Sequence, residues 1–157
     1  MNSSKSYTLE EATKKMESYC AYQERCHKEV LTKLTEMHMI PKAIDVIIAH
    51  LITNNYLNEE RFAKNFARGK FNIKKWGKRK IVQELKTRDI SKYNIENALK
   101  EIEDGDYMRT LHTLATKRLF QLSDKSVLEK KRKLADYLLY RGWEPNLIYE
   151  KINELMP

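Results

Sequence analysis

A chain of 157 residues, 41% of them hydrophobic, is long enough to bury a core without disulfides or a structural metal. No apolar run approaches the roughly 18 residues of a membrane span, and residues 1–5 contain no apolar segment of the kind that directs export. Two cysteines in such a chain fit a reducing cytoplasm better than a disulfide framework. Only four Gly and three Pro argue against a hairpin-rich β protein, so we expect a helical one.

The net charge of +8 is concentrated in the middle third of the chain. Residues 1–57 hold seven Lys/Arg and seven Asp/Glu, residues 58–102 hold thirteen and six, and residues 103–157 hold ten and nine. A diffuse excess of this size would say little about binding partners. An excess confined to one segment is the electrostatic pattern expected of a surface that binds a polyanion.

One pattern of apolar residues occurs three times, with internal steps of 4, 5, 5, 4 and 3 residues and offsets of 51 and 53 residues between copies. Steps of 3 and 4 keep side chains on one helical face, and a step of 5 marks a turn between two helices that share a core. The copies are Val30, Leu34, Met39, Ile44, Ile48, Leu51; Ile81, Leu85, Ile90, Ile95, Leu99, Ile102; and Leu134, Leu138, Trp143, Ile148, Ile152, Leu155. The pattern predicts a repeated helical unit in which Leu34, Leu85 and Leu138 are equivalent buried residues.

Each unit gains a third helix from an amphipathic segment upstream of the repeated pair. The TLEE sequence at 8–11 has the form of a capping box, and Asn58, Ser91 and Asp106 can each cap a helix. The expected helices are 8–23, 26–37, 41–54, 58–71, 77–88, 91–102, 106–121, 126–141 and 145–155. The sequence therefore predicts an all-α fold of three tandem three-helix repeats, 1–57, 58–102 and 103–157, stacked into an elongated, curved array. A single compact bundle is the structural alternative.

The turns inside the repeated pairs should have a common backbone conformation. His38, Asp89 and Gly142 occupy the position at which a helix commonly ends in the left-handed region, and all three residue types tolerate it. Pro41 and Pro145 follow, and proline suits the first turn of a helix. Different residues thus meet the same backbone requirement in different copies.

The richest basic stretch lies in the second repeat, and no acid interrupts it between residues 60 and 84. Its members are Arg68, Lys70, Lys74, Lys75, Lys78, Arg79 and Lys80, with Lys86 beyond them. Lys75, Arg79 and Lys86 have the spacing of a stripe along the expected helix 77–88. Such residues neutralise phosphates and release counterions, whereas the alternative is a solvated surface. For Phe71 and Trp76, which lie within the stretch, we favour a place in the core over stacking on bases.

A second basic run, residues 130–133 with the sequence KKRK, lies on the expected helix 126–141. Glu129 and Asp136 flank it. We interpret it as a solvated helix face. The alternative is an extension of the basic groove of the second repeat.

The sequence contains no pattern typical of catalysis or of metal binding. Cys20 and Cys26 are six residues apart and would not share a helical face, and the four histidines show no paired metal-ligand spacing. Glu59 and Glu60 stand where helix starts favour acids, so capping or an ion pair to Arg61 explains them better than acid–base chemistry. We therefore expect neither an enzyme nor a bound metal or cofactor.

Several segments resemble the RecX family of regulators of the RecA recombinase. They are YLNEERFA at 56–63, KF at 70–71, KWGKRKI at 75–81 and QEL at 83–85, and the match continues through Ile90, Ser91, Ile95, Ala98 and Leu99. The motif residues with an expected structural role are Glu59, Glu60, Arg61, Phe62, Ala63, Trp76, Gly77, Ile81 and Leu85. One departure is Asn58, where the family usually has Asp; Asn caps a helix about as well.

The resemblance implies a fold of three tandem three-helix units and a role in recombination, DNA repair and the SOS response. Family members bind RecA and its filament on single-stranded DNA, lie in the filament groove and usually inhibit strand exchange. Many also bind DNA, double-stranded DNA included. We therefore expect a cytoplasmic, monomeric regulator without a cofactor. The alternative is a free-standing helical-repeat module that binds DNA or RNA without RecA.

Overall fold

The computed structural model describes residues 6–157, which form nine α-helices and no strand. Residues 1–5, on which the expected lack of an export signal rests, lie outside the described part. The helices are α1 (Leu9–Tyr22), α2 (His27–Glu36), α3 (Pro41–Thr53), α4 (Glu59–Asn72), α5 (Lys78–Thr87), α6 (Lys92–Leu99), α7 (Asp104–Gln121), α8 (Val127–Tyr140) and α9 (Pro145–Leu155). The all-α prediction is confirmed, and every helix end lies within three residues of the expected one.

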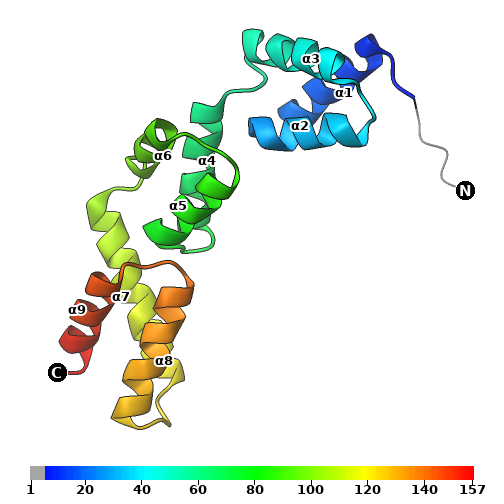
Figure 1. Cartoon of the computed structure of the whole chain (residues 1–157). Coiled ribbons are helices and arrows are strands. Elements are labelled where there is room, and N and C mark those ends of the chain that lie inside the picture. The colour runs from blue at the N-terminus through cyan, green and yellow to red at the C-terminus, as the bar shows by residue number, and fades with distance from the viewer. Residues whose placement is uncertain (1–5) are drawn as a thin grey trace, which may run out of the picture.

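The helices are grouped in threes, and the three groups follow one another along a bent, elongated path (Figure 1). We call α1–α3 unit one, α4–α6 unit two and α7–α9 unit three. The middle helices of the units, α2, α5 and α8, lie on the inner side of the bend in Figure 1. The elongated arrangement excludes the single compact bundle.

Local sequence accounts for most helix ends. The side chain of Thr8 accepts a hydrogen bond from the Glu11 amide and that of Glu11 accepts one from the Thr8 amide, which is the expected capping box. Asn58 and Ser91 cap α4 and α6 through their side chains, as predicted. The prediction that Asp106 caps α7 is wrong. That helix begins two residues earlier, and the Asp106 carboxylate instead binds Arg109 in the first turn.

The predicted turn geometry is confirmed in all three repeated pairs. His38, Asp89 and Gly142 have φ values of 59°, 57° and 86°, in the left-handed region. Pro41 and Pro145 are the first residues of α3 and α9. The helix ends are therefore set by the backbone preferences of single residues.

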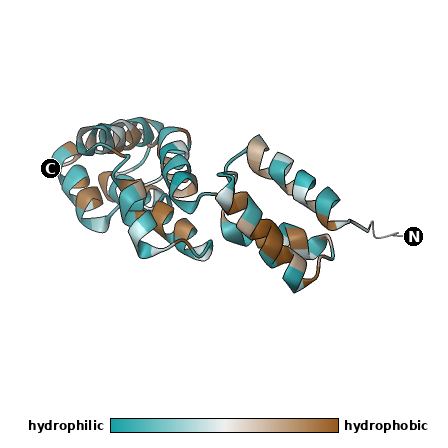
Figure 2. Ribbon diagram, turned by 90° about the horizontal axis from the view of Figure 1, so that it is seen from above, coloured by the Kyte–Doolittle hydropathy of each residue, from teal (hydrophilic) through white to brown (hydrophobic). Residues whose placement is uncertain are grey.

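The repeated apolar pattern forms the interior. Leu34, Leu85 and Leu138 are each 0% exposed, which confirms that they occupy equivalent buried positions. The residues fall into two hydrophobic clusters rather than three. One lies within unit one, and the other runs continuously through units two and three. Figure 2 shows these two bodies, joined by a narrow connection. Cys26 is the one buried unit-one residue in the second cluster.

The backbone joins unit three to the start of α5. The Gly77 amide donates to the Arg141 carbonyl at 2.8 Å, and the Arg79 amide donates to the Gly142 carbonyl at 3.0 Å. These bonds satisfy first-turn amides that have no acceptor within their own helix. A Cβ atom at Gly77 would lie 2.4 Å from the Gly142 carbonyl oxygen, so this approach requires glycine.

Aromatic packing closes the same joint. Tyr107 stacks on Trp143 with ring centroids 4.3 Å apart, and the Trp143 indole donates to the Lys75 carbonyl at 3.2 Å. The Tyr107 hydroxyl donates to the Glu144 carboxylate and accepts from the Lys78 amide at 2.8 Å. Burial raises the pKa of this hydroxyl, and the bond to Glu144 raises it further. Unit two and unit three thus share both a core and a network of hydrogen bonds.

Candidate nucleic-acid interface

Side-chain charges hold unit one against unit two. Arg61 places Nε 2.7 Å from the Glu24 carboxylate, and its terminal nitrogens reach the side chain and carbonyl of Asn55. Glu59 accepts from the His27 amide at 3.3 Å. The expected ion pair between Arg61 and Glu59 or Glu60 is therefore wrong, because the Arg61 guanidinium turns back toward the linker between α1 and α2.

The remaining motif residues lie mainly in the shared core. Phe62, Ala63, Ile81 and Leu85 are buried, and Glu60 pairs with Lys64 one turn along α4 at 3.0 Å. These positions explain how the segment 56–85 forms a stable unit. The residues that we expect to bind a ligand are the basic ones around them.

The basic residues of unit two come from the end of α4, the following turn and α5. Arg68 is paired with Glu101, and Lys78 lies 3.8 Å from Asp104. Within residues 6–157, the other six expected binding residues have no carboxylate within ion-pair distance. They are Lys70, Lys74, Lys75, Arg79, Lys80 and Lys86. The surface therefore carries positive charge with which no carboxylate of the described residues forms an ion pair.

Aromatic rings and cations alternate across this surface. The Lys80 ammonium lies 4.8 Å from the centroid of the Tyr140 ring and 4.7 Å from that of Trp76. The Lys70 ammonium lies 5.0 Å from Trp76 and 5.4 Å from Phe66. The Arg88 guanidinium lies 4.8 Å from Phe66. We call this row the cation–aromatic ladder: Tyr140, Lys80, Trp76, Lys70, Phe66 and Arg88.

The ladder corrects part of the aromatic prediction. Phe71 is buried in the shared core, as predicted. Trp76 is only half-buried: it packs against that core and against Phe66 while two ammonium groups lie over its ring. Sequence reasoning assigned no binding role to Phe66, Arg88 or Tyr140. The available signal was that Phe66 and Arg88 lie within or beside the basic segment; nothing in the sequence pointed to Tyr140, which comes from unit three.

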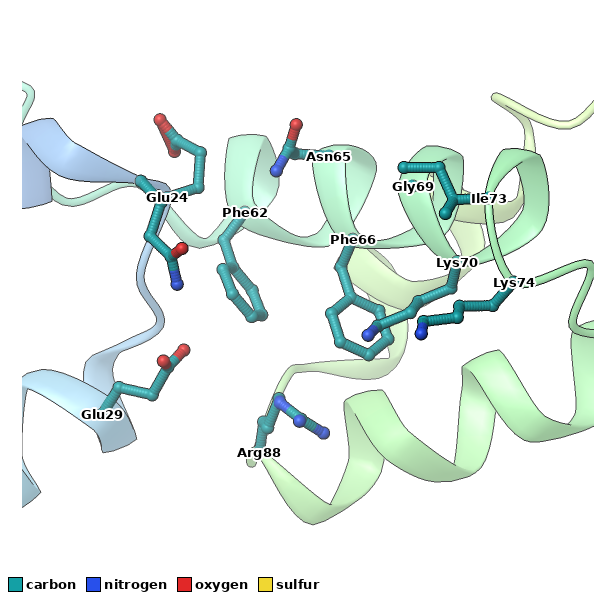
Figure 3. Close-up of a pocket in the computed structure, with 11 residues that line it drawn as sticks. Glu24, Glu29, Phe62, Asn65, Phe66, Gly69, Lys70, Ile73, Lys74 and Arg88 are labelled. Atoms are coloured by element: carbon teal, nitrogen blue, oxygen red, sulfur yellow. The ribbon is translucent and has the colours of Figure 1, made fainter.

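One end of the ladder opens into a cavity of about 470 Å³ at the joint between units one and two (Figure 3). The Phe66 ring is part of its lining, with Lys70 reaching toward it from α4, Lys74 from the turn after α4, and Arg88 from the position that follows α5. Glu24 and Glu29 line the side that belongs to unit one. The basic side of the cavity thus belongs to unit two, and its acidic side belongs to unit one.

One face of α5 forms a second basic region. Lys78, Arg79 and Lys86 line a shallow hollow of about 300 Å³ beside Glu144. The predicted stripe is only partly right, because Lys75 does not belong to it. Lys75 precedes α5, has a φ of 59° and lines a separate hollow with Asp106.

This arrangement suits the backbone of a nucleic acid. Unpaired cations neutralise phosphates, and half-exposed rings between them offer faces on which bases can stack. Within residues 6–157, no three His, Cys, Asp or Glu side chains lie close enough together to hold a metal ion. Burial raises the pKa of both free cysteines, Cys20 and Cys26, to about 11, which keeps these thiols protonated near neutral pH.

Comparison with protein-family models identifies two segments of the chain. Residues 58–99 match the second three-helix domain of RecX, and residues 105–152 match the third three-helix domain of RecX. None of the helices in residues 6–157 is long and apolar enough to span a bilayer. The two matched segments correspond to unit two and unit three.

Individual relatives carry the same name. The regulatory protein RecX of Lactobacillus johnsonii is 31% identical over 134 residues, which is 83% of this chain and 48% of that protein. The regulatory protein RecX of Prosthecochloris aestuarii is 26% identical over 88% of this chain and 89% of its own. The chain spans about half the length of the Lactobacillus relatives that it matches.

Solved structures agree with the fold. The crystal structure of RecX from Lactobacillus salivarius is similar with a TM-score of 0.82 and 28% identity, covering 94% of this chain and 96% of that one. A second crystal structure of a regulatory protein RecX has a TM-score of 0.83 at 21% identity, covering 93% of this chain and 73% of that one, and supports the fold alone. Because the two family models together cover more than half of its residues, this chain belongs to the RecX family of regulatory proteins.

Proposed function

We propose that this protein binds the RecA recombinase and its filament on single-stranded DNA, and that it inhibits strand exchange and recombination. Its membership of the RecX family supports RecA as the partner. The observation that carries the DNA part is the set of six basic residues in unit two that lack a carboxylate partner within the described chain. Family membership thus supports the protein partner, and the basic residues offer a surface for the DNA that the filament carries.

The proposed mechanism relies on contact rather than on chemistry. A groove in a nucleoprotein filament presents phosphates, and the cations of α4 and α5 supply the matching charge. Phosphate contacts fix position without reading sequence, so the protein acts on filaments of any sequence. The elongated shape lets it lie along such a groove as a monomer in the cytoplasm, where it hinders growth of the filament and the strand exchange that depends on it.

A pull-down from bacterial lysate, with and without nuclease treatment, tests the choice of partner. Retention of RecA after digestion of nucleic acid supports direct binding to the recombinase. Loss of RecA on digestion, together with undiminished binding of purified protein to DNA or RNA, would instead show the free-standing nucleic-acid module.

A charge variant tests the surface. Replacing Lys74, Lys75, Lys78, Arg79 and Lys80 with Ala should weaken binding to single-stranded DNA equally for all sequences, and should weaken inhibition of RecA-driven strand exchange. A control replaces Lys14, Lys33 and Lys42 of unit one with Ala, and it should retain both activities. Unchanged affinity and unchanged salt dependence in the unit-two variant would refute the proposed DNA contact.

A further inference from the structure

The same basic tripeptide occurs in unit two and unit three. Residues 78–80 read KRK and precede Ile81; residues 131–133 also read KRK and precede Leu134. The offset of 53 residues equals the offset between the second and third copies of the apolar pattern. The two tripeptides therefore occupy equivalent positions in successive structural repeats.

The structure gives the two tripeptides the same orientation. Arg79 and Arg132 are exposed, and the lysines on either side of each arginine are half-buried. Ile81 and Leu134, which follow the tripeptides, are both 0% exposed. Both tripeptides lie on the middle helix of a unit, α5 or α8, on the inner side of the bend in Figure 1. The repeat therefore places the same three cations twice, on two helices that lie on one side of the molecule.

The α8 tripeptide makes no ion pair in the described part of the chain. Within the described residues, Lys131, Arg132 and Lys133 have no carboxylate within ion-pair distance, although Glu129 and Asp136 lie on the same helix. Glu129 and Lys133, and likewise Arg132 and Asp136, are four residues apart, a spacing that allows an ion pair on a helix, yet neither pair closes to ion-pair distance. In this respect the α8 face resembles the unpaired surface of unit two.

Unit one does not continue the pattern. Its equivalent residues are His27, Lys28 and Glu29, so one cation is replaced by an acid. The Lys28 ammonium donates to the Thr87 carbonyl at 2.8 Å and lies 3.7 Å from the Asp89 carboxylate. This lysine holds unit one against unit two, and unit one lacks the basic tripeptide that units two and three share.

The two basic sites are continuous in space. The C-terminal end of α8 meets the start of α5 through the Gly77 amide and the Arg141 carbonyl. Lys133 and Tyr140 are seven residues apart, which places them on one helical face about 10 Å apart along the axis. The Lys80 ammonium then lies over the Tyr140 ring at 4.8 Å. A row leads from Lys133 through Tyr140 to the cation–aromatic ladder.

We propose that Lys131, Arg132 and Lys133 form a second phosphate-binding site, and that one strand of single-stranded DNA runs along α8 and α5. This inference rests on the proposed DNA contact of unit two and extends it to the unit that is nearly neutral in total charge. The occupant is a phosphodiester backbone, because cations without acidic partners complement phosphates and carry no base preference. Tyr140, exposed between the two sites, offers a face on which one base can stack.

The test measures binding of a fluorescent oligothymidylate, long enough to span both units, at several salt concentrations. Replacing Lys131, Arg132 and Lys133 with Gln should lower affinity and flatten the slope of log K against log salt by about 0.7 per lost contact, or about 2 in all. The single variant Arg132→Gln, which changes one exposed side chain, should flatten it by about 0.7. A matched control replaces Lys14, Lys33 and Lys42 of unit one with Gln and should leave the slope unchanged.

A parallel variant with Lys78, Arg79 and Lys80 replaced by Gln separates this inference from the proposed function. If that variant loses affinity while both α8 variants keep the wild-type slope, the second site is refuted and the unit-two contact stands. If all variants keep the wild-type slope, the DNA contact of unit two fails as well. Circular dichroism and tryptophan fluorescence establish that each variant is folded before its slope is compared.

Discussion

The two joints of this molecule are built from different interactions. Unit two and unit three meet through backbone hydrogen bonds, stacked aromatic rings and one continuous core. Unit one and unit two meet mainly through charged side chains, among them Arg61 with Glu24 and Lys28 with Asp89. Cys26 is the one buried side chain that unit one contributes to the shared core. A threefold repeat in sequence thus becomes two bodies in structure.

The difference shows how equivalent units can be joined with different strength. Burial of apolar surface and buried hydrogen bonds are little affected by salt, whereas exposed ion pairs are screened and contribute little each. We therefore expect units two and three to unfold together and unit one to unfold separately. Both tryptophans, Trp76 and Trp143, lie in the larger body, so their fluorescence reports on that body alone.

The largest expected effects come from the two cores. Leu85→Ala should destabilise the larger body by about 2–5 kcal/mol, because a cavity replaces a fully buried side chain. Leu34→Ala should destabilise unit one by a similar amount. In urea unfolding, Leu85→Ala should shift the tryptophan-fluorescence transition, whereas Leu34→Ala should shift only the far-ultraviolet circular dichroism. Equal shifts of fluorescence in both variants would mean that the chain unfolds as one body.

The close approach of Gly77 to Gly142 gives the next largest effect. Gly77→Ala should destabilise the larger body by about 1–3 kcal/mol, since its Cβ would overlap the Gly142 carbonyl oxygen and force the joint apart. Gly69→Ala is the matched control. It lies in α4 with nothing within 4 Å of the added Cβ, and it should stabilise the helix by about 0.5–1 kcal/mol. The urea midpoint of the tryptophan-fluorescence transition measures the stability of both variants. An unchanged midpoint for Gly77→Ala would refute a tight joint.

A mutation at the ionic joint between units one and two should change stability less than the mutations above, and its effect should depend on salt concentration. Arg61→Ala removes the contacts to Glu24 and Asn55 and should destabilise the attachment of unit one by about 1 kcal/mol at low salt. The same variant should differ less from wild type at about 1 M salt, because screening already weakens the pair. Thermal unfolding followed by circular dichroism at both salt concentrations measures this. A difference that grows with salt would contradict an ionic joint.

The smallest expected effect is a dependence of stability on alkaline pH. Burial raises the pKa of Cys20 and Cys26 from 9.0 to about 11, so the folded state favours the protonated thiols. Their contribution to stability is fully present below pH 9 and is lost as pH rises toward 11. Cys20 belongs to the core of unit one and Cys26 to the shared core.

Comparing urea midpoints at pH 8 and about 10.5 tests this. Cys26→Ala should reduce the alkaline loss of stability in the fluorescence transition, while Cys20→Ala should reduce it only in the circular-dichroism transition of unit one. If Cys26→Ala acted on unit one alone, its assignment to the shared core would be wrong.

The sequence predicted the local structure because each helix end depends on a few neighbouring residues. A single left-handed residue such as His38 or Gly142 ends a helix, and a cap such as Ser91 begins the next. Burial followed from the same periodicity, because residues spaced by 3 and 4 share a helical face. The interface was predicted only as a set of basic residues, without their arrangement.

The sequence by itself determined the helices, the threefold repeat, the buried leucines and the segment that carries the excess charge. Only the tertiary structure decided which units share a core, that Arg61 binds Glu24, and that Lys75 leaves the stripe of α5. It also decided that Tyr140 of unit three reaches Lys80 of unit two. These features depend on contacts between residues far apart in the chain, and helical periodicity constrains only residues that are close along it.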